Sequence, residues 1–307
     1  MNLISDLKNR LEMCIPLENI RADEPLSKHT SFRIGGPAEL MVFPHDCKEL
    51  SAVLKACSAL DIRPYLLGAG TNVLAPDEGL RGLVIVTKDA LTGLEMTDET
   101  HLCAMSGVSM TKTAMFASAH QLSGLEFAHG IPGTVGGGVY MNAGAYGGEI
   151  KNVAIKTDVM MLDGSVKCFE GDAQGFSYRS SAFQKLDGVI LRTIFELIPG
   201  NEAEIRERMR ELAEKRRASQ PLEYPSAGST FKRPVGGYAA ALIEQAGLKG
   251  LSVGGAAVSE KHAGFVINKG GATAADVLAL VKLVQARVYE HSGIQLEPEV
   301  RLWGEEK

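Results

Sequence analysis

Apolar side chains recur every three or four residues in several stretches, which is the spacing of one face of an α-helix. Polar residues that cap helices precede most of these stretches. Asp46 and Ser109 are examples, and Asn201 with Glu204 three residues on is similar to a capping box. The helices predicted in this way begin at the N-terminus, after Asp46, after Ser109, after Asn201, near Tyr238 and at Thr273.

Short apolar runs between these helices predict strands. The Asp163-Gly164 dipeptide separates two of the runs and predicts a hairpin turn there. Pro199-Gly200 interrupts the pattern, and we place a domain boundary at this point, between residues 1–199 and 200–307. The predicted strands cover residues 39–43, 64–67 (a buried strand), 83–86, 101–106, 153–162, 165–169 and 188–197.

The most unusual stretch is Gly124–Gly148, in which nine of 25 residues are glycine. Glycine adopts positive φ and has no Cβ, so such a run allows backbone N–H groups to converge on an anion. The stretch has almost no charged side chains, so a phosphate here would be held by amides. The alternative interpretation is a glycine-rich turn packed against a sheet.

A second glycine loop, Gly68–Asn72, follows the strand at 64–67. It is not a Rossmann fingerprint, because the third glycine is missing and Pro76 interrupts the place of the helix. Residues 107–113 are not a Walker A loop either, since Thr111 stands where glycine must precede Lys112. Two interpretations stay open for Gly68–Asn72, a phosphate cradle and a tight turn.

Composition excludes several classes of function. The net charge is −5 and no basic stripe is present, so we expect no nucleic-acid or membrane-surface role. No apolar run reaches membrane-spanning length, and the N-terminal segment is neither a signal peptide nor an anchor. The five cysteines are scattered and form neither a disulfide framework nor a metal motif. We expect a reduced, metal-free cytoplasmic protein with no obligate protein partner.

Seven segments together resemble one family, the UDP-N-acetylenolpyruvoylglucosamine reductases, which are flavoenzymes of peptidoglycan precursor synthesis. The segments occur in the family's order over nearly the whole chain: residues 31–36, 68–72, 130–137, 141–147, 178–181, 227–234 and 297–301. The resemblance implies an α+β fold. In it, a two-part FAD-binding domain of the vanillyl-alcohol-oxidase (PCMH) type, with lobes at about 1–90 and 91–199, precedes a smaller α+β substrate-binding domain.

The resemblance also implies roles for individual residues, with non-covalent FAD as cofactor, NADPH as co-substrate and no metal. The implied catalytic residues are Arg179, Ser229 and Glu299. The implied substrate-binding residues are Tyr178, Lys232 and Arg301. The implied cofactor-binding residues are Gly68, Ala69, Gly70, Thr71, Asn72, Gly133, Thr134, Gly136, Gly137, Asn142, Gly144 and Ala145.

Two departures from the family pattern are informative. Thr71 stands where serine is common, which keeps the hydroxyl. The short gap between Arg179 and Asn201 leaves no room for a loop whose tyrosine closes over the substrate in the longer variant of the family. The chain therefore resembles the shorter variant, in which another element must cover the UDP-sugar enolpyruvate.

The implied reaction places negative charge on the substrate carboxylate, which requires fixed positive charge nearby. Arg179 suits this role because its guanidinium is always charged and fork-shaped. Glu299 contributes only if burial beside Pro298 and Val300 keeps it protonated. Ser229, with Lys232 nearby, is the expected proton donor.

Two other classes of function stay open, and a feature of the sequence argues against each. A flavin oxidase on the same scaffold often carries a covalent flavin tether, but neither glycine loop (68–72 or 133–148) holds a histidine or cysteine. A nucleotide-binding protein without activity would not need the intact set of Arg179, Ser229 and Glu299.

Overall fold

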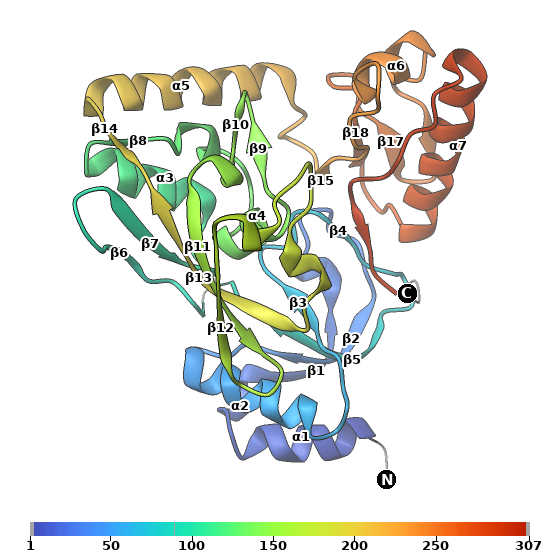
Figure 1. Ribbon diagram of the computed structural model, residues 1–307. Helices are drawn as coiled ribbons and strands as arrows, with labels where there is room; N and C mark the ends of the chain where they lie inside the picture. Colours follow the sequence, from blue (N-terminus) through green and yellow to red (C-terminus); the bar gives the residue numbers. More distant parts are fainter. Residues whose placement is uncertain (1–2, 89, 305–307) are drawn as a thin grey trace. The chain divides into compact units, whose positions relative to one another are not determined.

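The computed structural model of the protein describes residues 3–88 and 90–304, which form two compact units (Figure 1). Unit 1 comprises the chain up to Ala22, Leu40–Ala69 and Gly82–Lys215. Unit 2 comprises Asp23–Glu39, Gly70–Arg81 and the chain from Arg216 onward. Within the described ranges, no helix is both long and apolar enough to span a bilayer.

Helices and strands alternate irregularly along the chain, as in an α+β fold. The α-helices are α1 (Leu3–Glu12), α2 (Cys47–Ser58), α3 (Met110–Ala119), α4 (Val135–Tyr140), α5 (Glu202–Ser219), α6 (Ala239–Gln245) and α7 (Ala274–Ser292). A sheet of order β1-β2-β5-β3 is formed by β1 (Ile20–Pro25), β2 (Pro37–Val42), β5 (Leu80–Val86) and β3 (Tyr65–Leu67). The boundary between the units passes through β1, β2 and β5.

Unit 1 contains an antiparallel sheet of order β12-β11-β13-β7-β6 (Figure 1). The predicted hairpin at Asp163-Gly164 joins two of its strands, and Gly164 has φ +81° at the turn. The strands are β12 (Val166–Glu170), β11 (Ala154–Met161), β13 (Gly188–Glu196), β7 (His101–Met105) and β6 (Leu94–Met96).

Two helices of unit 1, α2 and α3, begin where the sequence predicts. Asp46 accepts hydrogen bonds from the N–H groups of Lys48 and Glu49 at the start of α2, and Ser109 accepts one from Lys112 in α3. The predicted buried strand at 64–67 is present as β3, but Leu66 is 39% exposed, so only one of its faces is covered.

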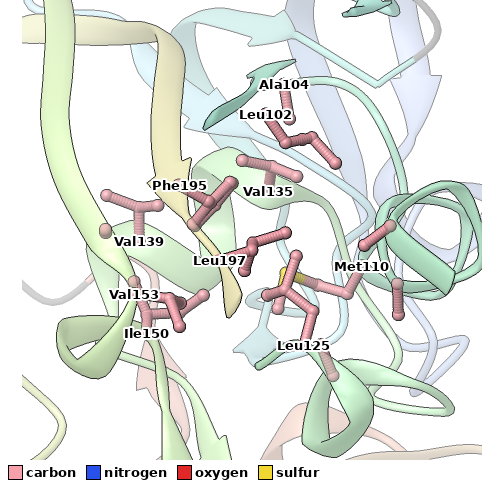
Figure 2. Close-up of a cluster of buried hydrophobic side chains, with 14 of the residues drawn as sticks. Leu102, Ala104, Met110, Leu125, Val135, Val139, Ile150, Val153, Phe195 and Leu197 are labelled. Atoms are coloured by element: carbon pink, nitrogen blue, oxygen red, sulfur yellow. The ribbon is translucent and has the colours of Figure 1, made fainter. Parts of the chain in front are cut away.

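Helix α4 lies inside the glycine-rich stretch, where no helix was predicted. Its Val135 and Val139 are buried and point into a hydrophobic cluster with Phe195 and Met110 (Figure 2). Gly136 makes the packing possible, because a Cβ there would lie 2.8 Å from the Cβ of Ser106. Burial of the two valines outweighs the poor helix propensity of the glycines.

Unit 2 contains a second antiparallel sheet, of order β15-β18-β17-β16. Its helices α6 and α7 share a hydrophobic core with the sheet. The strands are β15 (Ser226–Ser229), β18 (Phe265–Asn268), β17 (Ala256–Val258) and β16 (Ser252–Val253). Among the described residues, three further pairs of two-residue strands occur: β4 (Val73–Leu74) with β19 (Arg301–Leu302), β8 (Leu122–Ser123) with β14 (Ile198–Pro199), and β9 (Gly144–Ala145) with β10 (Gly148–Glu149).

Specific hydrogen bonds explain why two N-terminal segments belong to unit 2. The carboxylate of Asp77 accepts from the first two N–H groups of α7, those of Ala274 and Ala275, at 2.7 and 2.9 Å. Ser31 donates to the carbonyl of Ser226 at 2.6 Å. The compact units are therefore interleaved in sequence, whereas the functional division into 1–199 and 200–307 stays a prediction.

Thr273 and Asp276 form a capping box at the start of α7. The backbone N–H of Thr273, and next that of Gly255, lower the pKa of the Asp276 carboxyl below its ordinary value of 3.8. A lowered pKa contributes stability that is present above 3.8 and is lost as the pH falls through the lower folded value.

We therefore expect Asp276→Asn to lower the thermal unfolding temperature at pH 7 and to have progressively less effect as the pH drops below 3.8. Thermal unfolding of both proteins across this pH range measures the difference. A constant difference at every pH would contradict the capping role of the charge.

Candidate active site

The loop after β3 contains the first predicted cofactor residues. A Cβ on Gly68 would lie 2.7 Å from the hydroxyl of Thr134, so only glycine fits there. The N–H of Ala69, the last residue of unit 1 in this loop, donates to no acceptor in the described part of the chain. An amide in this state is available to a ligand.

The remainder of the loop belongs to unit 2. Gly70 has φ +63°, and a Cβ there would overlap the carbonyl of His29. The side-chain Nδ2 of Asn72 donates to the backbone carbonyl of Glu299 at 3.3 Å. The backbone carbonyl of Asn72 accepts from the N–H of Arg301 at 3.0 Å. Asn72 therefore fixes the segment that carries two other predicted site residues.

Several amides at the start of α4 are already used within the protein. The N–H of Val135 donates to the carbonyl of Val108, and that of Gly136 donates to the carbonyl of Ser106, both at 2.8 Å. Thr134 is the N-cap of the helix, and its buried hydroxyl accepts from Gly137 at 3.4 Å. These three amides of the glycine-rich stretch are therefore not available to a phosphate.

Gly137 differs from the other glycines of α4. It is exposed, and a Cβ there would meet only the hydroxyl of Thr134 at an ordinary 3.7 Å. The fold itself therefore does not require glycine at this position. The lack of a side chain leaves the backbone of Gly137 open to close approach by a ligand. The predicted Gly133, with φ +130°, is by contrast required by the backbone.

Asn142 is buried with φ +43°, and its side chain is engaged by protein groups. Its Nδ2 donates to Glu149 and to the carbonyl of Ser177, both at 2.9 Å, and its Oδ1 accepts from the N–H of Lys151 at 2.9 Å. These contacts join the end of the glycine-rich stretch to the turn before Arg179. Any cofactor contact of Asn142 falls to its backbone.

The predicted Gly144 and Ala145 form the first strand of the β9–β10 hairpin. A Cβ on Gly144 would lie 2.7 Å from the Cβ of Glu149, which explains the glycine. Tyr146 and Gly147 have φ values of +53° and +89° at the two-residue turn, as in a type I′ hairpin.

Arg179 lies in a tight turn in which Ser177 and Ser180 exchange backbone hydrogen bonds at 3.0 and 3.1 Å. Its φ of +54° is unusual for a bulky residue. The guanidinium donates from Nη1 to the carbonyl of Gly144 at 3.3 Å, and its Cζ lies 5.5 Å from the ring centroid of Tyr178. Half-buried and permanently charged, Arg179 is suited to binding a carboxylate.

In unit 2, the segments that carry Ser229 and Glu299 pair directly. Gly228, with φ +77°, lies within an irregularity of β15 that redirects the strand before Ser229. The carbonyl of Thr230 accepts from the N–H of Glu299 at 2.8 Å. Ser229 and Glu299 are both half-buried, and residues distant in sequence are thus brought to one place.

Lys232 does not present an isolated charge, because its Nζ lies 3.0 Å from Oε2 of Glu297 in an exposed ion pair. Arg301 begins β19, which pairs with β4 in parallel. Sequence reasoning missed Thr230, whose hydroxyl accepts from the N–H of Val266 at 2.9 Å and anchors the residue next to Ser229. The sequence alone does not show whether a threonine hydroxyl inside a motif holds the backbone in place or binds a ligand.

The residues of unit 1 fit a flavin dinucleotide. Ala69 offers an amide without a protein acceptor, and Gly137 offers a bare, exposed backbone beside Thr134. Both features suit close approach of a phosphate-bearing ligand. A metal site has no comparable support, since the described residues contain no cluster of three or more His, Cys, Asp or Glu side chains that could hold an ion.

Two family models match the chain. One describes an FAD binding domain and matches residues 38–169. The other describes the C-terminal domain of UDP-N-acetylenolpyruvoylglucosamine reductase and matches residues 220–303. The second match contains the segments of Ser229 and Glu299, and the first contains the glycine loop at 68–72 and the stretch around α4.

Relatives of this kind cover almost the full chain. UDP-N-acetylenolpyruvoylglucosamine reductase of Syntrophomonas wolfei is 44% identical over 95% of this chain and 97% of its own. The reductase of Agathobacter rectalis is 48% identical over 95% and 96% of the two chains. The crystal structure of the Thermus caldophilus reductase has a TM-score of 0.78 at 34% identity, covering 92% of this chain and 98% of that one. The chain belongs to the UDP-N-acetylenolpyruvoylglucosamine reductase family.

Proposed function

We propose that this chain is an FAD-containing, NADPH-dependent enzyme that reduces the enolpyruvyl group of UDP-N-acetylglucosamine enolpyruvate to give UDP-N-acetylmuramate. The observation that carries the proposal is 44–48% identity to reductases of that name over nearly the entire chain. The product is a precursor of peptidoglycan, and we assign the reaction to the cytoplasm, in line with five scattered cysteines that indicate no disulfide framework.

The reaction adds a hydride to the terminal carbon of the enolpyruvyl double bond and a proton to the carbon beside the carboxylate. FAD, when bound, supplies the hydride, which originates from NADPH. Negative charge develops on the carboxylate, so donors and positive charge at that end lower the barrier.

Arg179 binds the carboxylate in this proposal. Its guanidinium is always charged, and two backbone hydrogen bonds between Ser177 and Ser180 fix the turn that carries it. A hydrogen bond from the N–H of Glu299 to Thr230 holds the backbone of Glu299. When its carboxyl is protonated, Glu299 stabilises the negative charge that develops on the substrate carboxylate. Ser229 gives its proton to the carbon beside the carboxylate. Its backbone is fixed by the neighbouring Thr230.

The proposal also divides cofactor and substrate between the two parts of the chain. Residues 1–199 bind FAD, and residues 200–307 bind most of the substrate. Tyr178, Lys232 and Arg301 contact the substrate. Lys232 would have to leave its ion pair with Glu297 to do so. The FAD contacts lie in two loops and comprise Gly68, Ala69, Gly70, Thr71, Asn72, Gly133, Thr134, Gly136, Gly137, Asn142, Gly144 and Ala145.

We expect the chain, purified without any partner, to be yellow and to release its flavin on denaturation. Anaerobic addition of NADPH should bleach the flavin absorbance, and the enolpyruvyl substrate should restore it. A flavin oxidase would instead be reduced by an alcohol, and a binding protein without activity would not be bleached by NADPH. Failure of the substrate to restore the absorbance would contradict the proposed function.

We also expect reduction of the flavin by NADPH and its reoxidation by the substrate to be separate half-reactions, with NADP+ leaving before the sugar nucleotide enters. One flavin domain and one substrate domain support this order. Initial rates measured while both substrates vary should give parallel double-reciprocal lines. Intersecting lines, or a stable complex with both substrates, would contradict it.

A further inference from the structure

We propose that Gln184 is a positioning residue that holds Arg179 in its active geometry. The inference rests on the proposed function, which assigns Arg179 to the substrate carboxylate. Arg179 has φ +54°, a conformation that is unfavourable for a bulky residue. Neighbouring groups must therefore maintain this conformation.

Gln184 contacts the backbone of Arg179 directly. Its Nε2 donates to the carbonyl of Arg179 at 3.1 Å and to the carbonyl of Tyr140 at 2.9 Å. The same nitrogen also lies 3.7 Å from Sδ of Met141, so its two protons serve three acceptors, of which the two carbonyls are the closer. The Tyr140 carbonyl, at the end of α4, also accepts from the hydroxyl of Ser181 at 2.7 Å. Gln184 thus joins the Arg179 turn to the end of α4.

A second carboxamide holds the other side of the same turn. Asn142 donates to the carbonyl of Ser177 at 2.9 Å, and Ser177 pairs with Ser180. The guanidinium of Arg179 in turn donates to the backbone carbonyl of Gly144, two residues after Asn142. The turn is therefore fixed at both ends to the segment after α4. Loss of the Gln184 bonds leaves the carbonyl of Arg179 without this donor and allows its backbone to leave the positive-φ region.

The test is Gln184→Glu, which preserves the size of the side chain. An ionised carboxylate cannot donate, and it would repel both carbonyl oxygens. We expect reoxidation of the reduced flavin by the enolpyruvyl substrate to slow by roughly tenfold or more, the scale on which small misplacements act, with a raised KM for that substrate. Flavin content and the rate of flavin reduction by NADPH should stay near those of the wild type, because neither requires the substrate carboxylate to be bound. Gln184→Ala should act in the same direction.

Gln174 offers a matched control in the same unit. It is buried, donates to the carbonyl of Ala154 at 2.9 Å and accepts from the hydroxyl of Thr157 at 2.8 Å. It therefore also ties side chain to backbone, but its partners lie on β11. Gln174→Glu should lower the unfolding temperature and leave both half-reactions of the folded enzyme unchanged. If it slowed reoxidation as much as Gln184→Glu, the effect would be general destabilisation and the proposal would be overturned.

A double-mutant cycle tests whether Gln184 acts through Arg179. We expect Gln184→Glu to have little further effect on reoxidation in an Arg179→Lys background. Full additivity would overturn the positioning role, as would a normal rate in Gln184→Glu alone. If Arg179→Lys itself reoxidised at the normal rate, the assignment of Arg179 would fail, and this inference with it. The single Arg179 variant thus separates the two failures.

Discussion

Replacement of Ser229 by alanine is expected to leave flavin reduction by NADPH unchanged and to slow reoxidation by the enolpyruvyl substrate by roughly 10²-fold or more. This corresponds to about 3 kcal/mol in the barrier, the usual scale for loss of a positioned acid. The reason is that only the second half-reaction requires a proton at the carbon beside the carboxylate. Stopped-flow absorbance of each half-reaction alone measures the two rates.

Two further variants make this result specific. Ser229→Cys should recover part of the reoxidation rate, because a thiol still donates a proton. Ser226, at the start of the same strand, is a matched control whose hydroxyl accepts from the N–H of Gly228 at 3.5 Å. Ser226→Ala should leave both rates near those of the wild type. If Ser229→Ala slowed both halves equally, or neither, the serine would be structural, and Glu299 or a water would be the acid.

Arg179→Lys should also slow reoxidation, with weaker substrate binding. A lysine ammonium is a point charge and cannot reproduce the two parallel donors of a guanidinium on a carboxylate. The expected signature is a raised KM together with a lowered kcat, whereas Ser229→Ala should mainly lower kcat. An Arg179→Lys enzyme with an unchanged KM would contradict the carboxylate contact.

Local signals predicted much of the fold. Asp46, Ser109 and Thr273 cap helices where their side chains precede apolar periodicity, and Asp163-Gly164 turns a hairpin. These features depend on neighbours within a few residues. Helix α4 was not predicted, because glycine disfavours helices and the packing of Val135 and its neighbours against distant strands decides the outcome.

The same distinction between local and distant contacts holds for the candidate site. Motifs identify Arg179, Ser229 and Glu299 through resemblance, but their physical support comes from contacts that are distant in sequence. The pairing of Thr230 with Glu299 is one example, and the contact of Asn72 with Glu299 is another. The sequence did not predict the role of Asp77 either. Its carboxylate accepts from the first two N–H groups of α7 and so links residues 70–81 to the rest of unit 2. Contacts between residues so far apart in the sequence cannot be predicted from the periodicity of apolar positions.

The sharpest test of the flavin site is the pair Gly137→Ala and Gly137→Val. The position is exposed, has ordinary φ and leaves room for a Cβ. Alanine there should therefore leave the fold intact and even stabilise α4 by roughly 0.5–1 kcal/mol, the usual gain over glycine in a helix. Valine should expel the flavin, because its side chain would occupy space that we assign to the cofactor. The ratio of flavin to protein absorbance and an FAD titration of the apoprotein measure the loss.

Neighbouring glycines separate this effect from damage to the fold. Gly136→Val should unfold the region, because a Cβ there lies only 2.8 Å from the Cβ of Ser106. Gly133→Val should also lose flavin, but its φ of +130° makes any side chain strained even without a cofactor. Of these three glycines, Gly137 is the one that combines an undisturbed fold with an expected loss of flavin. If Gly137→Val kept full flavin and a native unfolding temperature, the start of α4 would not face the cofactor, and the flavin contacts would have to be sought in the loop at Gly68–Asn72 alone.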